Sequence, residues 1–580
     1  MNQIMTTKKQ DISIVIAGEA GQGIQSVEQL LVQILHHSDY FVFSTKEYMS
    51  RVRGGSNSTE IRVSPLPVNS FVDRIDILVV LDKKAFDHVS YRLTDDTIII
   101  GDKKHVSTLN HPHIFSFDFL KTAKEIGNKV YANTIAVGLL ASLFHIPTDV
   151  IKHHISAFFE DKSDQIIADN IQAINQGKEF AKDLSQTIRF PQKLNTNNQS
   201  TNNESLLLLN GTQSIGLGAL AGGCNFISSY PMSPSTGVLT FLASQGEKAN
   251  VLVEQAEDEI AAVNMALGAW YAGARALVTT AGGGFALMGE GLSLAAMTET
   301  PVVIHVAQRP GPATGLPTRT EQGDLQLALY SGHGEFPRVI FAPGTLQQGF
   351  FLTKKAFDIA DAFQIPVIIL SDQYFVDSKY QTKTFLGLEE KPHYHIVETT
   401  ESYQRYTDDP SGVSPRGIPG HGSGFIHIDS DEHDADGRIT ERADVRRNMV
   451  EKRLRKMQDL QQQSIQPTLY GSAEYDVLLV GWGSTVNIIE EARDQLETNR
   501  VSFLHFSQVY PLHPKTKKLL EKARYVIVIE NNATAQFADL LEKETGVSVN
   551  AHILQYTGHP FSVETLLNRI PRTIQALEDQ

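Results

Sequence analysis

The sequence predicts an α/β protein that contains several domains. Three stretches of the 580 residues alternate short apolar segments with amphipathic ones, which is the pattern of strands and helices in largely parallel sheets. The length allows roughly three or four domains of ~100–200 residues each. A segment rich in Asn, Gln, Ser and Thr, 185–205, predicts a linker. We therefore expect domains over 1–184, 206–390 and 471–580, with an irregular connecting segment over 391–470.

The first stretch begins with the apolar strand "ISIVIAG" and continues into a helix. Its apolar residues Ile24, Val27, Leu31, Ile34 and Leu35 have helical spacing. Further on, "RIDILVVLD" and "DDTIII" predict strands, and "ANTIAVGLLASLFHI" predicts a second helix. This order predicts a largely parallel sheet for the first domain.

The second αβ stretch covers 206–390, and an irregular region rich in Gly, Pro, Asp and His follows it. That region ends in "RADVRRNMVEKRLRKMQDLQQQ", whose charges predict a solvated or docking helix. The pattern then returns with the strands "YDVLLVGWG", "VSFLHF" and "YVIVIENN" and the helices "NIIEEARDQLE" and "KTKKLLEKA". These elements predict a third, smaller αβ domain.

Composition limits the possible functions. A formal net charge of −15 argues against a nucleic-acid-binding surface. No apolar run has the ~18–20 residues of a membrane span, and the N-terminus lacks the apolar core of a signal peptide, so we expect a cytoplasmic protein. The one cysteine, Cys224, cannot supply the usual thiolates of an iron–sulfur cluster. We expect Cys224 to be a small buried residue, and any cluster to lie on another chain.

The glycine loop "GEAGQG" follows the first strand and contains Gly18, Gly21 and Gly23. Its G-x-x-G-x-G order differs from the dinucleotide fingerprint G-x-G-x-x-G, and the ribose-binding acid ~20 residues later is absent. Arg51 and Arg53 follow, and they could add charged hydrogen bonds to a phosphate. We favour an anionic phosphate ligand over NAD or FAD, with a simple tight turn as the third possibility.

A long block of the second domain carries a specific resemblance. The segments "SSYPMSPSTG" at 228–237 and "VEQAEDEIAAVNMALGAWYAGARALVTTAGGGFALMGEG…HVAQRPGPATGLPTRTEQGDL" within 253–325 resemble the alpha subunit of 2-oxoacid:ferredoxin oxidoreductases, which are thiamine-diphosphate enzymes. The motifs "GEAGQGIQS" and "SRVRGGSNS" resemble the gamma subunit of that family. The chain thus resembles a fused gamma–alpha subunit over nearly its whole length. The resemblance implies a gamma-type αβ domain, then a pyrimidine-type αβ domain, then a transketolase C-terminal-like αβ domain.

In that family a glutamate hydrogen-bonded to the aminopyrimidine ring activates the cofactor, and the resemblance gives this catalytic role to Glu259. An apolar setting would raise the pKa of the carboxyl and help it to share a proton. The alternative is that Glu259 joins Glu254, Glu257 and Asp258 in a solvated acidic helix start. We favour catalysis for Glu259 and the solvated role for Glu254 and Glu257.

The resemblance also implies a substrate site. Arg309 would bind the 2-oxoacid carboxylate, and Thr318 and Ser233 would place hydroxyls near the 2-oxo group. The family usually has Thr where this chain has Ser233, so the hydroxyl stays and a methyl is lost. Tyr230 and Pro231, in the same segment as Ser233, are expected at the cofactor. The glycines of "TAGGGFALMGEG" would let the backbone approach the cofactor closely, or would form a plain turn.

One expected motif is missing. Thiamine-diphosphate enzymes hold the diphosphate through Mg²⁺ with a G-D-G motif and a later Asn, and neither "GDKK" nor "GDLQ" continues in that way. The resemblance then implies a beta-type partner subunit that holds the diphosphate, Mg²⁺ and a [4Fe-4S] cluster. The thiamine diphosphate would be shared between the two chains, in a dimer of heterodimers.

Two further segments have weaker signals. The acidic run "DSDEHDADG" around His433 faintly matches a metal loop, but its spacing is wrong for an EF-hand and we interpret it as structural. Asn531 and Asn532, in "VIENNATAQFADLL", would face a ligand or a partner, or would cap a loop, which we favour. We therefore expect no metal ligand on this chain.

The function that these observations predict is oxidative decarboxylation of a 2-oxoacid. By the resemblance, CO₂ leaves, two electrons pass singly through the partner's cluster to ferredoxin, and coenzyme A accepts the acyl group. The motif "RPGPATGLPTRTEQ" favours 2-oxoglutarate, with pyruvate and branched-chain 2-oxoacids as alternatives. The glycine loop becomes a candidate site for the coenzyme A phosphates. A non-catalytic binding subunit, or a dinucleotide-binding oxidoreductase, is the competing interpretation.

Overall fold

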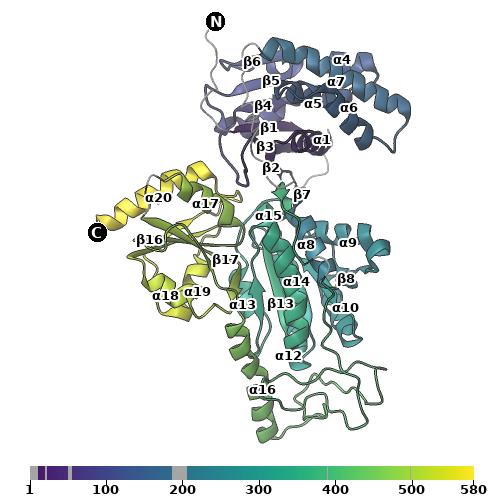
Figure 1. The fold of residues 1–580 in the computed structure, drawn as a ribbon, viewed down its shortest axis with the longest axis vertical. Coiled ribbons are helices and arrows are strands. Elements are labelled where there is room, and N and C mark those ends of the chain that lie inside the picture. The colour runs from purple at the N-terminus through teal and green to yellow at the C-terminus, as the bar shows by residue number, and fades with distance from the viewer. Residues whose placement is uncertain are drawn as a thin grey trace, which may run out of the picture. The chain divides into compact units, whose positions relative to one another are not determined.

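The protein was analysed as a computed structural model that describes residues 11–19, 23–49, 55–185, 206–387, 390–496, 498 and 500–579. The chain divides into two compact units. Unit 1 contains residues 1–209 with the short segments 378–384 and 562–564, and unit 2 contains 210–377, 385–561 and 565–580. Within the described residues the strands form three sheets, one in unit 1 and two in unit 2 (Figure 1).

The sheet of unit 1 has the order β6-β5-β4-β1-β3-β2-β14-β7. Its strands are β1 Ile12–Glu19, β2 Phe41–Glu47, β3 Ser56–Ser64, β4 Ile77–Val80, β5 Ile98–Asp102, β6 Ile114–Phe117, β7 Leu207–Asn210 and β14 Lys379–Thr382. Strands β1, β4, β5 and β6 pair in parallel, whereas β1–β3, β3–β2 and β2–β14 are antiparallel.

Helices cover both faces of this sheet. They are α1 Ile24–His37, α2 Lys83–Val89, α3 Lys103–Val106, α4 Phe119–Ile126, α5 Tyr131–Leu143, α6 Thr148–Phe158 and α7 Asp164–Ser185, with a 3-10 turn at Ser90–Arg92. Alternate residues of β1 enter different cores: Ile14 and Ile16 pack in the core that contains α1 and α5, whereas Val15 and Ala17 pack in a smaller core with Val89 of α2. This alternation is why the whole strand is apolar.

The prediction of a largely parallel sheet for the first domain is therefore correct for only half of it. Strands β2 and β3 are joined by residues 48–55 alone, which is too short a connection for the crossover that a parallel pair requires. The two strands consequently form an antiparallel pair, and β14, which comes from late in the chain, extends it. Most of the predicted linker, 186–205, lies outside the described residues.

The larger sheet of unit 2 has the order β18-β12-β13-β11-β10-β8-β9, and its strands are parallel except for the β12–β18 pair. They are β8 Phe226–Ser229, β9 Leu252–Gln255, β10 Ala276–Thr280, β11 Val302–Gln308, β12 Val339–Phe341, β13 Pro366–Asp372 and β18 Gln508–Tyr510. Strands β10, β11 and β13 are buried throughout, as the central strands of a covered parallel sheet must be.

Two of the helices around this sheet begin with capping boxes. They are α8 Gly211–Ala221, α9 Thr236–Ala249, α10 Glu259–Tyr271, α11 Gly282–Leu287, α12 Gly289–Met297, α13 Leu325–Tyr330, α14 Leu346–Phe363, α15 Gln373–Asp377 and α16 Ala443–Gln462. Asn210 with Gln213 forms a capping box at α8, and Thr345 with Gln348 forms one at α14. Figure 1 shows α14 lying along β13. None of the described helices is both long enough and apolar enough to cross a membrane.

The second sheet of unit 2 has the order β15-β17-β16-β19-β20 and confirms the αβ pattern predicted from residue 474 onward. Its elements are β15 Thr468–Tyr470, β16 Val477–Trp482, β17 Val501–Phe506, β19 Tyr525–Glu530, β20 Ala551–Leu554, α17 Val486–Asp494, α18 Thr516–Glu521, α19 Gln536–Thr545 and α20 Val563–Glu578, with a 3-10 turn at Gly483–Thr485. In Figure 1, α17 and α20 lie on one side of β16 and β17, and α18 and α19 lie on the other. The mixed α/β, multidomain fold class is confirmed.

The predicted charged helix is α16, and its charges are not all solvated. Lys452 and Lys456 are each 1% exposed in their side chains and form ion pairs of 2.6 Å with the two oxygens of Glu299, which follows α12. Arg453 is also buried and pairs with Glu432 at 2.9 Å. The helix therefore docks through cations on its inner face, and the solvated alternative is wrong for that face.

Candidate active site

Most of the predicted site residues of unit 2 lie at the carboxyl ends of neighbouring parallel strands. Tyr230, Pro231 and Ser233 follow β8, and Glu259 begins the helix after β9. Gly282–Gly284 follow β10, and Arg309 follows β11 directly. Strands β9, β8, β10 and β11 are consecutive neighbours in the sheet. Ligands of open α/β sheets bind at this edge, so the fold brings these residues to the expected place.

Glu259 differs from the neighbouring acidic residues because its side chain is buried and theirs are exposed to solvent. Glu254, Glu257 and Asp258 are exposed, and Asp258 caps α10 by accepting from the Ala261 N–H at 2.8 Å. Glu259 is only 3% exposed, and its Oε1 has no hydrogen-bond partner among the residues that the structure describes. Burial raises the pKa of its carboxyl, a hydrogen bond from its own backbone N–H opposes that effect, and Asp258 adds to it. A buried carboxyl that favours its proton and has one free oxygen suits a ligand with a hydrogen-bonding ring nitrogen.

The glycine run at the start of α11 lies directly against this carboxyl. A Cβ on Gly284 would come within 2.5 Å of Glu259 Oε1 and would overlap the Thr280 hydroxyl. A Cβ on Gly282 would overlap the carboxyl group of Asp324. Glycine is therefore required at both positions so that the backbone can approach two carboxyl groups.

Arg309 and Ser233, both predicted at a substrate site, lie in contact with each other. The Arg309 Nη1 donates to the Ser233 backbone carbonyl at 2.7 Å. Burial lowers the pKa of Arg309, and Asp324 opposes that effect. Thr318 is buried in the segment after Arg309, whereas Tyr230 is 41% exposed. Neither Thr318 nor Tyr230 forms a hydrogen bond with Arg309 within the described part of the chain.

Asp324, a buried acid at this edge of the sheet, was not predicted as a site candidate from the sequence. It precedes α13, and its backbone N–H donates to Gln308 Oε1 at the end of β11 at 3.0 Å. Burial raises the pKa of its carboxyl to about 6, with a further increase from Glu321 and a decrease from Arg309. Its Oδ2 is buried and lacks a hydrogen-bond partner in the described ranges. One sequence feature could have indicated Asp324: it lies in "TRTEQGDL", directly after the predicted substrate residues. Its Gly-Asp pair does not continue as a diphosphate motif.

Asn531 and Asn532 hold the segment that carries Asp324. The Asn531 N–H donates to Gln322 Oε1 at 3.0 Å, and Asn532 Nδ2 donates to the Gln322 carbonyl at 3.2 Å. Asn532 Oδ1 also accepts from the Thr534 N–H at 3.2 Å. The Asn532 side chain therefore caps its own loop, as predicted, whereas the Asn531 side chain donates to the Gln555 carbonyl at 2.7 Å. Both residues attach the second sheet to the segment of Gln322.

The acidic segment around His433 is ordered by packing. The His433 ring is fully buried, lies 3.9 Å from the Tyr406 ring between centroids, and has Nδ1 2.9 Å from the Asp431 carbonyl. Over the described ranges, no three His, Cys, Asp or Glu side chains are grouped closely enough to hold a metal ion. Cys224 is buried, and burial raises the pKa of its thiol to about 12, which makes it a poor nucleophile.

Unit 1 contains the candidate coenzyme A loop. Gly18 lies in β1, and Gly23 precedes α1 in a left-handed conformation with φ 79°. Gly21, Arg51 and Arg53 lie outside the described residues. A cavity of about 290 Å³ opens beside the start of α1, where Gly23, Ser26 and Asn133 belong to its lining. The described glycines are compatible with a ligand at this helix start, and the phosphate role stays a prediction.

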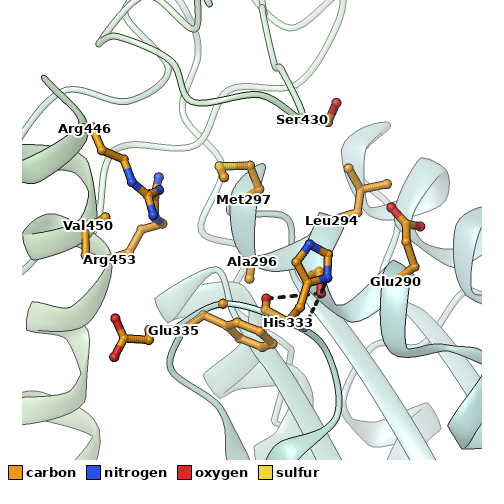
Figure 2. A pocket seen from close by; sticks show the side chains of 13 residues that line it. Glu290, Leu294, Ala296, Met297, His333, Glu335, Ser430, Arg446, Val450 and Arg453 are labelled. Atoms are coloured by element: carbon orange, nitrogen blue, oxygen red, sulfur yellow. Dashed lines mark hydrogen bonds between the residues drawn. The ribbon is translucent and has the colours of Figure 1, made fainter. Parts of the chain in front are cut away.

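A separate pocket of about 290 Å³ lies between α12, the turn 333–336 and α16 (Figure 2). His333 Nδ1 lies 3.0 Å from Ser293 Oγ at its base, and Arg446 and Arg453 point into it from α16. Both arginines already pair with Glu432. None of the predicted site residues that the structure describes lines this pocket.

Comparison with protein families gives two matches in this chain. Residues 217–452 match the family described as pyruvate flavodoxin/ferredoxin oxidoreductase, thiamine diP-binding. Residues 13–180 match the family described as pyruvate ferredoxin/flavodoxin oxidoreductase.

Curated relatives and a solved structure match over long ranges. The 2-oxoacid:ferredoxin oxidoreductase subunit alpha of Saccharolobus solfataricus is 29% identical over 97% of this chain and 98% of its own length. The 2-oxoglutarate synthase subunit KorA of Archaeoglobus fulgidus is 32% identical over 56% of this chain and 88% of its own length. A structure of 2-oxoglutarate:ferredoxin oxidoreductase from Magnetococcus marinus, with 2-oxoglutarate, coenzyme A and succinyl-CoA bound, matches with a TM-score of 0.90 and 28% identity. That match covers 98% of this chain and 100% of the other.

Proposed function

Since this chain belongs to the family of 2-oxoacid:ferredoxin oxidoreductase alpha subunits, we propose that it is the fused gamma–alpha subunit of a 2-oxoglutarate-oxidising enzyme. The products are succinyl-CoA and CO₂, and the electrons pass to ferredoxin. The observation that carries the proposal is the buried carboxyl of Glu259, whose Oε1 has no partner among the described residues, at the strand edge that also holds Arg309.

The residues of this edge fit a thiamine-type cofactor. The unpartnered Oε1 of Glu259 would bind the aminopyrimidine ring, with Gly284 allowing the backbone to pass close to it. The chemistry that thiamine diphosphate supplies is that of a carbon nucleophile at its thiazolium ring. With its raised pKa, the Glu259 carboxyl would share a proton with a ring nitrogen of such a cofactor.

Arg309 orients the substrate. Its guanidinium is half-buried at the end of β11, and its planar donors suit a carboxylate. The hydroxyls of Ser233 and Thr318 complete the anion site in this proposal. The preference for 2-oxoglutarate is supported by the ligand in the Magnetococcus marinus structure and by the name of the Archaeoglobus fulgidus relative. Pyruvate and branched-chain 2-oxoacids are the alternative substrates.

A beta-type partner subunit holds the diphosphate, Mg²⁺ and a [4Fe-4S] cluster in this proposal. One cysteine in the chain and the missing G-D-G motif support this division. Apolar side chains near Glu259 also support a docked partner: Ile260 is 51% exposed and Leu287, at the end of α11, is 52% exposed. Coenzyme A is assigned to the Gly18–Gly23 loop of unit 1, with Arg51 and Arg53 on its phosphates.

The decisive experiment is viologen reduction by the chain co-purified with its partner, with 2-oxoglutarate, coenzyme A and thiamine diphosphate. Glu259→Gln should lower kcat by at least about 100-fold, because the amide cannot exchange a proton. Arg309→Ala should raise KM for 2-oxoglutarate by about 100-fold through loss of a charged carboxylate contact. Glu257→Gln, an exposed neighbour, is the matched control and should retain full activity.

Two outcomes would contradict the proposal. Unchanged turnover in Glu259→Gln or Arg309→Ala would remove these residues from the site. A purified complex that binds thiamine diphosphate or coenzyme A but turns over no 2-oxoacid would favour the competing binding subunit.

A further inference from the structure

The carboxyl of Asp324 is a second buried acid at the candidate site, and the proposed function does not use it. Asp324 and Glu259 both lie against the glycine run of α11, Asp324 at Gly282 and Glu259 at Gly284. Each has one oxygen without a hydrogen-bond partner in the part of the chain that the structure describes. Two such carboxyl groups beside one backbone turn need an explanation, because unpaired buried polar atoms are costly.

The surroundings of Asp324 contain few charges. Glu321 acts on it from its own segment, and Arg309 acts from the end of β11. On its other side lies Gly282, at the start of α11, which has no charge. The neighbouring αβ domain contributes only neutral amides: Gln536 Nε2 donates to the Gly323 carbonyl at 2.9 Å, and Asn532 Nδ2 donates to the Gln322 carbonyl. No described residue forms an ion pair with Asp324, so one distant cation, Arg309, is its main electrostatic support.

That support is also the proposed anchor of the substrate carboxylate. Asp324 lies beside the end of β11, because its backbone N–H donates at 3.0 Å to the side chain of Gln308, the residue before Arg309. An anion bound to Arg309 would neutralise the guanidinium and add a negative charge on the same side of the sheet edge as Asp324. Both changes disfavour the ionised form of a buried carboxyl. The linkage is reciprocal, so an ionised Asp324 must equally weaken the binding of an anion.

We propose that Asp324 is a further ionisable residue of the 2-oxoacid site, and that it takes up one proton from solvent when an anionic 2-oxoacid binds beside Arg309. The inference rests on the proposed function for the identity of the ligand. It assigns Asp324 a positioning role: its neutral form leaves Arg309 free for the substrate, and its ionised form competes for the same cation.

The test measures binding without turnover. The full chain, co-purified with its partner and freed of thiamine diphosphate and coenzyme A, is titrated calorimetrically with 2-oxoglutarate at pH 5.5–8 in buffers of different ionisation enthalpy. We expect uptake of close to one proton at pH 7. We also expect a Kd that rises with pH above about pH 6, by at most tenfold per pH unit, because burial raises the pKa of the free carboxyl to about 6.

Two variants identify the titrating group. Asp324→Asn should bind 2-oxoglutarate with no proton uptake and less than about a twofold change of Kd over this pH range. Glu321→Gln, the matched control, should keep the proton uptake. An infrared difference spectrum of the wild-type complex should show a new protonated carboxyl on ligand binding, which tests the inference even if Asp324→Asn does not fold.

The outcomes separate this inference from the proposed function. If Arg309→Ala abolishes binding but the wild type takes up no proton, only the role of Asp324 is wrong. Proton uptake that persists in Asp324→Asn would also overturn that role. If Arg309→Ala binds as the wild type does, or if the wild type does not bind 2-oxoglutarate at all, the proposed substrate site fails and the inference fails with it.

Discussion

At the scale of single residues, burial separates the functional candidates from their neighbours. Four acids lie within 254–259, and their residue types alone do not rank them. The structure places Glu254, Glu257 and Asp258 at the surface and only Glu259 in the interior. A carboxyl kept in the interior with a free oxygen costs stability, so its position is better explained by a ligand than by folding.

The glycine run offers a residue-level test of this site. Gly284→Ala should lower kcat by about 100-fold, because the new methyl would displace the Glu259 carboxyl from its place. We also expect a loss of ~1–3 kcal/mol in the free energy of unfolding from overpacking. Viologen reduction and thermal unfolding of the same preparations measure the two effects.

Gly283→Ala is the matched control for this substitution. The nearest atom to its Cβ is the Ala313 carbonyl oxygen at 3.8 Å, which is ordinary contact. Near-wild-type activity is expected from this variant. Equal losses in both variants would mean that the glycines serve the turn alone and not the Glu259 carboxyl.

The sequence predicted much of the site and missed part of it for a physical reason. The motif in 228–325 predicted roles for Glu259, Arg309 and Ser233, and the structure places all three at strand ends on one edge of the sheet. Asp324 was missed because its significance depends on contacts with Gly282 after β10 and on a segment held by Asn532 from the second sheet. Such contacts join residues tens to hundreds of positions apart, so they cannot be predicted from local sequence patterns.

At the scale of elements, helix α16 shows how a strongly charged sequence becomes an internal support. Its charge pattern predicted solvent-exposed side chains, but Lys452 and Lys456 form ion pairs with Glu299 in the interior. Although burial acts to raise it, these two lysines and Arg405 hold the pKa of Glu299 well below its usual range. Charge alone therefore did not reveal the helix face that docks, because the partner acid lies more than 150 residues earlier in the sequence.

Removal of that acid should be costly. Glu299→Ala leaves two buried ammonium groups unpaired and should lower the free energy of unfolding by about 3–5 kcal/mol at pH 7. The native pKa of Glu299 is depressed, so its contribution is present above its unfolded value of 4.5 and is lost as the pH falls. Denaturant unfolding should therefore show a difference between wild type and variant that shrinks below about pH 4.

The control for this prediction lies on the same helix. Asp444 pairs with Arg442 at 2.7 Å, and both side chains are largely exposed. Asp444→Asn should leave the unfolding midpoint unchanged, since exposed ion pairs contribute little. A Glu299→Ala protein as stable as Asp444→Asn would show that the buried lysines find other partners.

At the scale of the whole molecule, the two units divide the proposed chemistry. The residues proposed for the 2-oxoacid site, Glu259, Arg309 and Asp324, belong to unit 2, whereas the candidate coenzyme A loop belongs to unit 1. Each unit has its own hydrophobic core. A substitution in one core or loop can therefore change one half of the reaction and spare the other.

This division predicts separable kinetics. Gly23→Val places a β-branched residue at φ 79°, with its Cβ 3.0 Å from Asn133 Nδ2, and so distorts the start of α1. We expect KM for coenzyme A to rise by about tenfold, equivalent to ~1.4 kcal/mol, while release of CO₂ from 2-oxoglutarate changes less than about twofold. Initial rates at varied coenzyme A and a CO₂-release assay measure the two steps.

A second unit 1 variant controls for general destabilisation. Gly101→Ala in β5 would overlap Val106 on the face opposite α1 and should weaken the fold. It should do so without raising KM for coenzyme A. Parallel loss of both steps in Gly23→Val would indicate that the loop only shapes the turn.

The membership of unit 1 has a consequence for the order in which the protein is made. Strand β14, Lys379–Thr382, extends the sheet beside β2, and Ser562–Glu564 reaches Asp73, whose N–H donates to Glu564 at 2.9 Å. A nascent chain that has emerged from the ribosome only as far as residue 185 carries β2 as an open sheet edge, which is a template for wrong pairing. The first unit to be translated is thus completed late: its edge at β2 stays open to other chains until residues 379–382 have been made, and its contact at Asp73 waits for residues 562–564.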